Sequence, residues 1–344
     1  MPGMDFMIPP REDPLRLLGY RESIFAPDLL IAASAWLDLF TRLSNEAADL
    51  EGICAALGLS RRPADVMLTL LTAMGLLARE DGMFRVTELA AEFLVEGSPW
   101  NLGPYLASLK ERPVCREMLE VLRTGKPARW GAREDEDEWV VAMERGDFAR
   151  SFTAAMDGRG AYLASLMARS LDCEGRSRLL DIAGGSGIYA CAVAAAHPHM
   201  SAAVLEKPPV DSAARSAISE RGMSEGVSAI AGDMLSGELP AGFDVHLLSH
   251  VLHDWDVPAV EKILESSHES LAPGGMVAVY DAHVDADKAG PLEVAEYSVL
   301  LMFSTEGKCY SVEEMEEMLA GAGFEDMRYV PTAAHRSLIT ARKA

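Results

Sequence analysis

Apolar residues recur at helical spacing through the first part of the chain, from about residue 14 to residue 125. The run over residues 26–43 is apolar enough to predict a helix that is buried on most sides. A second helix ends at Gly58, and a third begins after Ser60, a residue type that often caps helix N-termini. The predicted elements are helices over 26–43, 50–57 and 61–74, a small hairpin over 76–86 and a helix over 87–93. This order is typical of a winged helix.

The pattern changes near Arg178, where short apolar runs of strand length begin to alternate with helical patterns. The predicted strands cover 179–182, 201–205, 227–231, 243–249, 276–281 and 337–341. Such alternation predicts a Rossmann-like α/β fold, a parallel sheet covered by helices. We therefore expect a mostly helical domain over 1–110, a helical linker over 111–177 and a sheet domain over 178–344.

The charge and the cysteines narrow the possible partners and compartments. The 344-residue chain has 53 acidic and 31 basic residues, a net charge of −22. Such a surface repels nucleic acids and anionic membranes, so we expect neither as a partner. The five cysteines show no Cys-x-x-Cys spacing, which favours a reducing compartment. Without a signal-peptide pattern or an apolar run of membrane-spanning length, we expect a soluble, cytoplasmic protein.

A glycine-rich turn follows the first predicted strand. The stretch 179–187 reads Leu-Leu-Asp-Ile-Ala-Gly-Gly-Ser-Gly, and a helical pattern comes next. Glycines let the backbone approach a ligand, and a helix N-terminus offers N–H groups to an anion. Gly185, Gly187 and Ala190 also fit the dinucleotide pattern Gly-x-Gly-x-x-Ala, with Glu206 about 20 residues further on. The turn alone therefore fits a NAD-dependent dehydrogenase as well.

Acidic residues at strand ends separate the two cofactors. Asp181 stands just before the glycines, where it can receive the cationic amino group of S-adenosylmethionine (SAM) but would repel a pyrophosphate. Asp233 follows the strand over 227–231, where it can accept a hydrogen bond from an adenine amino group while Met234 packs on the ring. Both positions favour SAM over NAD.

With these residues in view, the chain from about residue 25 onward resembles the two-domain class I SAM-dependent small-molecule O-methyltransferases. These include acetylserotonin, caffeic-acid-type and bacterial secondary-metabolite enzymes. The resemblance rests on the glycine-rich turn, Glu206, Gly232-Asp233-Met234, Leu252-His-Asp-Trp255 and Pro273-Gly-Gly275. It implies SAM as cofactor and an N-terminal winged-helix domain that forms homodimers. The implied cofactor residues are Asp181, Gly184 and Gly185 for the methionine part, Glu206 for the ribose, Asp233 and Met234 for the adenine, and Ser249 near the adenine.

Methyl transfer to oxygen requires removal of the acceptor proton, and a histidine, which titrates near neutrality, suits this task. The resemblance assigns the general base to His253 and the acid that orients it to Asp281. A second supporting Glu is expected after Gly307-Lys308, where this chain has Cys309. The departure keeps open an alternative: a SAM-binding enzyme with non-methylating chemistry, such as hydroxylation, decarboxylation or cyclisation.

The resemblance also implies an acceptor pocket between the domains. Its expected lining is Phe152, Met156, Met302 and Phe303. An apolar wall rich in Met suits a flat aromatic compound, because Met adapts to irregular shapes. Ordinary core packing would explain the same residues equally well.

Three histidines, His246, His250 and His253, invite a metal interpretation. His246 and His250 share one face of a predicted strand, however, and would lie about 13 Å apart at roughly 3.3 Å per residue. No carboxylate cluster of the kind that binds magnesium stands out either. We therefore expect no metal, in line with the usual metal independence of the family.

A winged helix also raises the alternative of a ligand-sensing transcription regulator. Its recognition helix would be residues 61–74, which carries Arg61 and Arg62 at its start and no further cation. The apolar surface of this helix and that of residues 26–43 predict a homodimer interface instead. The sequence thus predicts a homodimeric, metal-independent, SAM-dependent O-methyltransferase.

Overall fold

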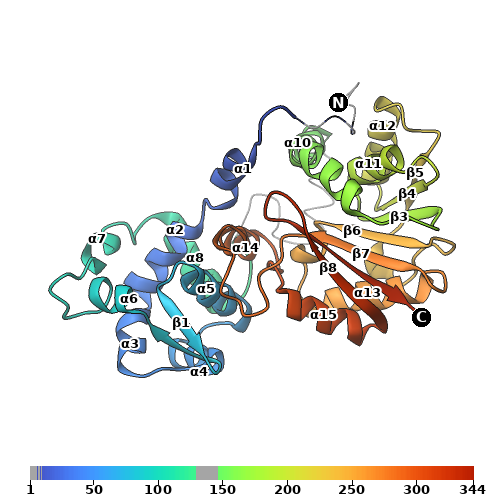
Figure 1. Cartoon of the computed structure of the whole chain (residues 1–344). Helices are drawn as coiled ribbons and strands as arrows, with labels where there is room; N and C mark the ends of the chain where they lie inside the picture. Colours follow the sequence, from blue (N-terminus) through green and yellow to red (C-terminus); the bar gives the residue numbers. More distant parts are fainter. Residues whose placement is uncertain (1–5, 7, 9, 129–145) are drawn as a thin grey trace. The chain divides into compact units, whose positions relative to one another are not determined.

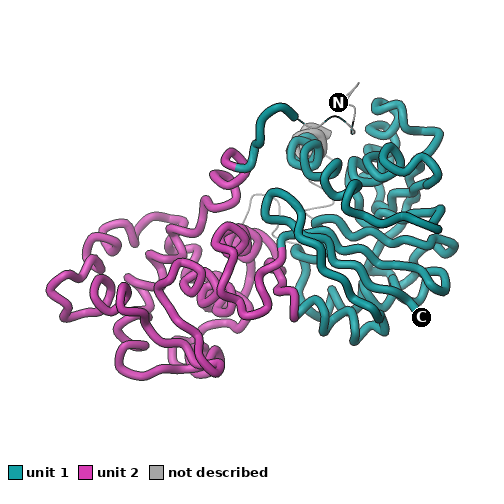
Figure 2. The backbone as a smooth tube through the Cα atoms, in the orientation of Figure 1, with its two compact units in different colours: residues 1–15, 131–282, 314–344 teal, residues 16–130, 283–313 magenta. Residues whose placement is uncertain are grey.

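The computed structural model describes residues 6, 8, 10–128 and 146–344, and it leaves out the side chains of residues 146–153 (Figure 1). The described residues form two compact units (Figure 2). The sheet unit, drawn in teal, comprises residues 1–15, 131–282 and 314–344, and the helical unit, drawn in magenta, comprises residues 16–130 and 283–313. Residues 283–313, which the sequence analysis assigned to the sheet domain, thus pack with the N-terminal part. The predicted boundaries at 110 and 177 stay a prediction.

The helical unit contains the predicted order of three helical segments and a hairpin. Its elements are α1 (Leu15–Glu22), α2 (Ala26–Ile31), η1 (Ala32–Trp36), α3 (Leu39–Asn45), α4 (Leu50–Leu57), α5 (Arg61–Ala73), β1 (Leu77–Glu80), β2 (Met83–Val86), α6 (Glu88–Phe93), α7 (Gly103–Ala107), α8 (Pro113–Thr124) and α14 (Leu292–Ser304). Gly58 ends α4 with a φ of 64°, as predicted. Ser60 precedes α5, but its side chain makes no capping hydrogen bond.

The first predicted helix is wrong in its continuity. Residues 26–43 form α2, a π-helical turn over Ala32–Trp36, and α3. Asp38 takes a φ of 50° at the start of α3, in the left-handed region that ends regular helices. Apolar periodicity alone carries no signal for such a break, since both pieces bury their apolar side chains.

The predicted homodimer surface is also wrong in its location. The apolar side chains of α5 are buried within the chain: Met67, Leu68 and Leu70 are 0% exposed. The core that covers them includes Leu29 of α2 and Val299 of α14. The apolar face of α5 therefore needs no second chain, because residues 283–313, far away in sequence, supply the cover.

The sheet unit contains a seven-stranded sheet in the order β5-β4-β3-β6-β7-β9-β8. The strands are β3 (Arg178–Ile182), β4 (Ser201–Glu206), β5 (Val227–Ala231), β6 (Val245–Ser249), β7 (Met276–Asp281), β8 (Phe324–Pro331) and β9 (Ser337–Lys343). The five strands from β3 to β7 are parallel, and β9 runs antiparallel to both of its neighbours, β7 and β8. All six predicted strands are confirmed. The sequence analysis missed β8, an edge strand that is exposed along most of its length.

Helices connect these strands, as the alternating pattern predicts (Figure 1). They are α10 (Gly146–Ser170), α11 (Ile188–Ala196), α12 (Val210–Glu220), α13 (Val257–Ser270), α15 (Val312–Gly321) and the short 3-10 helices η2 (Met234–Ser236) and η3 (Leu252–Asp254). The core of this unit is formed by buried side chains of β3, β6, β7, α10 and α11. The connection that leaves β3 leads to β4 on one side, and the connection that leaves β6 leads to β7 on the other side. A ligand crevice is therefore expected at the carboxyl ends of β3 and β6.

Among the described residues, no single helix is long and apolar enough to cross a membrane, whereas one bent pair, residues 15–36 with 39–45, meets that test jointly. All five cysteines lie in the described part of the chain, and none of them forms a disulfide.

Candidate active site

The glycine-rich turn links the end of β3 to the start of α11. Gly185 and Gly187 have φ values of 58° and 74°, in the left-handed region that suits glycine. A Cβ atom on Gly184 would collide with the carboxyl group of Asp181. Glycine at residue 184 therefore allows the turn to pass directly against that carboxyl group, which any side chain there would displace.

Asp181 is fully buried at the end of β3. Its Oδ2 accepts a hydrogen bond from the N–H of Ala190 at 3.2 Å, and its Oδ1 has no hydrogen-bond partner among the described residues. Burial raises the pKa of Asp181 to about 8, with a smaller contribution from Glu206, against the hydrogen bond from Ala190. A cationic group placed at Oδ1 would be strongly favoured, because it would offset the cost of the buried charge.

Glu206 ends β4 and is tied to the same turn. Its Oε1 accepts a hydrogen bond from the N–H of Gly185 at 2.8 Å, and its Oε2 accepts one from the N–H of Lys207 at 3.2 Å. Burial raises the pKa of Glu206, and these two backbone donors oppose that effect. The carboxyl group is thus held next to the glycines.

Asp233 and Met234 follow β5, as predicted. The Asp233 Oδ1 accepts a hydrogen bond from the N–H of Leu235 at 2.8 Å, while its Oδ2 forms an ion pair with Nζ of Lys207 at 2.9 Å. Both carboxylate oxygens are therefore engaged within the chain. Met234 is half-buried beside it.

Ser249 ends β6 and is buried, and its Oγ has no hydrogen-bond partner among the residues that the structure describes. Together with Oδ1 of Asp181, this makes two buried polar atoms at the carboxyl edge of the sheet that call for a ligand partner. The glycine-rich turn passes directly against one of them at Gly184. These features fit a cofactor that carries an amino group, such as SAM.

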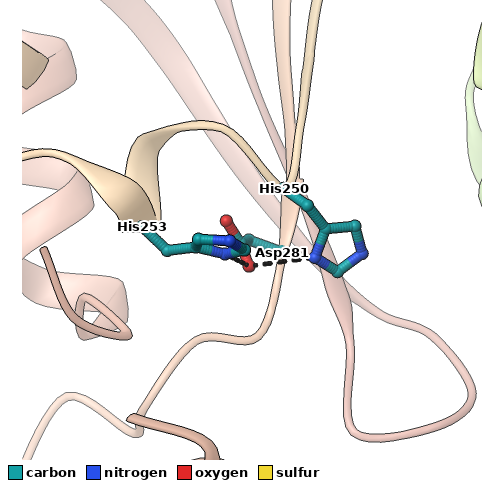
Figure 3. Close-up of side chains that lie close together, drawn as sticks. All are labelled: His250, His253 and Asp281. Carbon is teal, nitrogen blue, oxygen red and sulfur yellow. Dashed lines mark hydrogen bonds and ion pairs between the residues drawn. The ribbon is translucent and has the colours of Figure 1, made fainter. Parts of the chain in front are cut away.

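His253 and Asp281 meet at the ends of adjacent strands (Figure 3). His253 lies in η3 just after β6, and Asp281 is the last residue of β7. The Nδ1 of His253 lies 2.6 Å from Oδ1 of Asp281, and both side chains are buried. Burial alone would raise the pKa of Asp281, but the charge of His253 and hydrogen bonds from His250 and His253 hold it well below 3.8. The pair is an ionised carboxylate that orients an imidazole, the arrangement of a general base with its support.

The three histidines of the metal interpretation do not all come together. His246 lies within β6, where its Nδ1 pairs with Oγ of Ser267 at 2.9 Å, and burial lowers its pKa to about 3. His250 lies on the opposite side of Asp281 from His253, and its Nδ1 is 3.4 Å from Oδ1 of Asp281 (Figure 3). His250, His253 and Asp281 bring their ligand atoms within 4.8 Å of one another. The expected absence of a metal stays a prediction.

The expected acceptor residues are not brought together within one unit. Met156 is a half-buried residue of α10, whereas the side chain of Phe152 lies outside the described residues. Met302 and Phe303 are buried in the core of the helical unit, and the Phe303 ring packs on Phe25 with centroids 4.4 Å apart. Their assignment to an acceptor site stays a prediction.

Cys309 is buried in the helical unit, and its N–H donates a hydrogen bond to Oγ of Ser298 at 3.1 Å. No carboxylate side chain stands at this position, as the sequence already indicated.

Two features near the site were missed by the sequence analysis. One is the contact of His250 with Asp281. The other is a buried network in which Arg221 binds Oδ2 of Asp157 at 2.6 Å and the carbonyl of Ser186, a residue of the glycine-rich turn, at 2.7 Å. His250 was considered only as a metal ligand. Asp157 and Arg221 carry no sequence signal, because a contact between residues 64 positions apart leaves no local pattern.

Fold and candidate site together define the class: a mixed α/β protein with a mainly parallel sheet and a candidate cofactor site at the carboxyl ends of its strands. A sequence model of the O-methyltransferase domain matches residues 121–325. The chain is 33% identical over 306 residues, 88% of each chain, to the 3-hydroxy-5-methyl-1-naphthoate 3-O-methyltransferase of Streptomyces sahachiroi. It belongs to the O-methyltransferase family.

Solved structures agree with this membership. An O-methyltransferase family 2 protein of Planctomyces limnophilus DSM 3776, in complex with apigenin, matches with a TM-score of 0.89 and 31% identity over 100% of both chains. PigF with SAH matches with a TM-score of 0.61 and 27% identity, covering 96% of this chain and 100% of that chain. The protein is a SAM-dependent O-methyltransferase, and the dehydrogenase and regulator alternatives have no comparable support.

Proposed function

We propose that this enzyme methylates a hydroxyl group of a small aromatic secondary metabolite, with His253 as the general base. The observation that carries the proposal is the 2.6 Å contact between Nδ1 of His253 and Oδ1 of Asp281. It stands at the ends of β6 and β7, on the same edge of the sheet as Asp181. A buried, ionised acid behind an imidazole is the support that proton removal from a hydroxyl requires.

The carboxylate decides which nitrogen of His253 acts. Because Oδ1 of Asp281 is an acceptor, the proton of the neutral imidazole resides on Nδ1, and Nε2 has the lone pair that takes the hydroxyl proton. The negative charge of Asp281 then stabilises the imidazolium that forms. SAM supplies the methyl group as a sulfonium, whose transfer to the oxygen is an in-line displacement.

The residues at the strand ends divide the binding of SAM between them. Asp181 would bind the amino group through Oδ1, which has no partner among the described residues. Glu206 would bind the ribose hydroxyls while it holds the turn through Gly185. The remaining assignments are Gly184 and Gly185 for the methionine part, Asp233 and Met234 for the adenine, and Ser249 near the adenine.

The aromatic acceptor is supported by two relatives. One is named for a hydroxynaphthoate, and the other is a complex with apigenin. Phe152, Met156, Met302 and Phe303 are the residues that we propose for its binding. Rotation of the buried Met302 and Phe303 side chains would be part of that binding, since they are 0% and 2% exposed.

For the whole chain we propose a homodimer, with residues 1–110 as a winged-helix dimerisation domain, 111–177 as a linker that contributes to the acceptor site, and 178–344 as the catalytic domain. The support is the order of three helical segments and a hairpin, together with the resemblance in sequence. Five cysteines without a disulfide suit a reducing, cytoplasmic location.

The test replaces His253 by Ala. We expect turnover with a phenolic acceptor to fall by about two orders of magnitude or more, the range that a general base contributes. SAM affinity, measured by calorimetry, should stay within about twofold because the methionine part binds at Asp181 and the glycine-rich turn. Full retained turnover in the variant would refute the assignment of the base.

A further inference from the structure

Oδ1 of Asp281 faces three N–H groups. The Nδ1 of His253 lies at 2.6 Å and the backbone N–H of Ala282 at 2.8 Å. Nδ1 of His250 lies 3.4 Å away on the opposite side of the carboxyl group, beyond the range of a full hydrogen bond (Figure 3). The sequence analysis expected two acidic supports for the base and found Cys309 at the second position. The structure instead has a second imidazole on the first support.

His250 is held firmly where it meets Asp281. Its side chain is 1% exposed, and its ring lies 5.5 Å from the ring of Tyr280 and 5.9 Å from that of Tyr189. Its backbone N–H donates a hydrogen bond to the carbonyl of Tyr280 at 2.9 Å, which joins the end of β6 to the end of β7. The φ of His250 is 55°, a left-handed conformation that few residues other than glycine and asparagine adopt without strain. Strain of this kind persists where surrounding contacts enforce it, often at functional sites.

The carboxylate also determines the tautomer of His250. Burial and the charge of Arg159 hold the pKa of His250 well below 6.5, against the opposite effect of Asp281, so its ring is neutral at neutral pH. A neutral ring that faced Oδ1 with its Nδ1 lone pair would be repelled. The proton of His250 therefore resides on Nδ1 and points at Asp281.

We propose that His250 is a positioning residue for the catalytic pair: its Nδ1–H faces the carboxylate of Asp281 across 3.4 Å and favours its charged form, which in turn keeps the proton of His253 on Nδ1. The inference rests on the proposed function, in which His253 is the base. It also accounts for Cys309, which stands where the family has a second supporting Glu. In this chain the additional support for Asp281 and His253 comes from His250, just after β6. It also explains why a strained histidine stands there.

Several other groups face His250 and affect the interpretation of any pH profile. They are Arg159 on α10, Tyr189 on α11, His253 in η3, Tyr280 and Asp281 on β7, and Arg336 in the β8–β9 connection. The two arginines and two tyrosines keep their charge state between pH 6 and 9. Among the groups that face His250, a shift in this range therefore reports on the histidines and Asp281. The profiles are measured at saturating SAM, because burial raises the pKa of Asp181 in the proposed cofactor site to about 8.

The experiment compares His250→Leu with His250→Asn in the full-length enzyme. Leu removes the donor, whereas Asn places a side-chain N–H near the position of Nδ1 and tolerates the φ of 55°. We expect His250→Leu to lower kcat by roughly tenfold, the order expected when a charged group loses a hydrogen-bond partner. With fewer donors, Asp281 should also attract the His253 proton more strongly, so the acidic limb of kcat/KM should move to higher pH. His250→Asn should recover most of both effects.

The matched control is His246→Leu, four positions earlier on β6. His246 is equally buried but pairs with Ser267 and not with Asp281. His246→Leu should lower the free energy of unfolding without shifting the acidic limb of the kcat/KM profile. The dissociation constant for SAM, from calorimetry, should stay within about twofold in all three variants, since none of them alters the glycine-rich turn.

The outcomes separate this inference from the proposed function. If His253→Ala is inactive while His250→Leu matches the wild type in kcat and in pH profile, the positioning role of His250 is refuted. The assignment of His253 as the general base is then retained. Equal losses in His250→Leu and His246→Leu without a shift of the limb would also refute it, because the effect would then be structural. A chelator-sensitive activity restored by Zn²⁺ would show that the same three side chains hold a metal instead. Should His250→Leu not fold, His250→Gly lacks the donor without backbone strain and decides the question in its place.

Discussion

At the scale of single residues, Asp181 is the carboxyl group of the cofactor site with the largest burial. Its pKa is raised above the ordinary 3.8 to about 8, because the charged form has lost its water. At pH 7 the group is therefore mostly protonated in the free enzyme. The ammonium group of SAM favours the charged form, so binding should lower this pKa and release a proton.

We predict that SAM binding at pH 7 releases a proton from Asp181, because burial raises the pKa of this group to about 8 in the free enzyme and the ammonium group would lower it. Calorimetry in two buffers of different ionisation enthalpy measures this proton release directly. Asp181→Asn should bind SAM more weakly and release no proton. A wild-type enzyme without proton release would show that Asp181 does not receive the amino group.

The pair of His253 and Asp281 shows how far residue-level prediction reaches. The resemblance in sequence implied that the two side chains meet, and they lie 2.6 Å apart at the ends of neighbouring parallel strands. The contact of His250 with the same oxygen was not expected. It depends on a left-handed φ of 55°, which turns the ring back toward β7, and no sequence pattern marks a strained histidine.

At the scale of elements, strands buried on both faces were predictable and the exposed one was not. Every residue of β6 and β7 is buried, so both appear in the sequence as continuous apolar runs. Most residues of β8 are exposed, and its mixed polar composition carries no alternation. The break of the first helix at Asp38 was missed for a related reason: apolar spacing continues across it.

The glycine-rich turn allows an element-scale prediction at Gly184. A Cβ atom there would overlap the carboxyl group of Asp181, so that either this side chain or the turn must shift. We predict that Gly184→Ala weakens SAM binding about tenfold or more, a loss of ~1.4 kcal/mol. The dissociation constant from calorimetry is the measurement.

Gly158→Ala on α10 is the matched control, because a Cβ atom there meets nothing within 4 Å. It should leave SAM affinity unchanged and stabilise the helix by up to about 1 kcal/mol. Unchanged affinity in Gly184→Ala as well would mean that the cofactor does not use this turn.

At the scale of the whole molecule, residues 283–313 join the helical unit through a buried charge cluster. Nζ of Lys288 lies 3.0 Å from both carboxylate oxygens of Asp65 on α5, and Nζ of Lys308 lies 2.5 Å from one of them. These partners are 223 and 243 positions apart in sequence, which is why the sequence analysis assigned the segment to the other domain. Nothing in local periodicity reports such a pairing.

Asp65 should therefore matter for stability. Burial alone would raise its pKa, but the two lysines lower it to about 2, below the ordinary 3.8. A carboxyl group whose pKa is lower in the folded than in the unfolded chain stabilises the fold at pH values above its unfolded pKa. This contribution to the free energy of unfolding is lost as the pH falls from about 4 toward 2. We predict that Asp65→Asn lowers the free energy of unfolding by about 3 kcal/mol at pH 7, because Lys308 keeps a buried charge without its partner.

Urea unfolding at pH 7 and pH 3 measures the effect, and the difference between Asp65→Asn and wild type should shrink at the lower pH. The exposed pair of Arg61 and Glu51, 2.8 Å apart, provides the control. Glu51→Gln should cost less than about 0.5 kcal/mol. Equal costs for the two variants would contradict the role given to the buried cluster.

Exposed aromatic side chains of the helical unit are the surface that we assign to the proposed homodimer. The helical unit exposes Trp100 by 64% and Tyr105 by 77%, near and within α7, and large aromatic side chains in contact with water mark interaction sites. We predict a particle of twice the 37.1 kDa of one chain in sedimentation velocity, and dissociation to single chains in the double variant Trp100→Ser/Tyr105→Ser. Tyr329→Ser, at a residue 42% exposed on β8, should leave the dimer intact. A wild-type monomer would refute the homodimer, whereas a dimeric double variant would move the interface to another surface. The monomeric variant should still bind SAM, because every proposed cofactor residue lies in the sheet unit of a single chain.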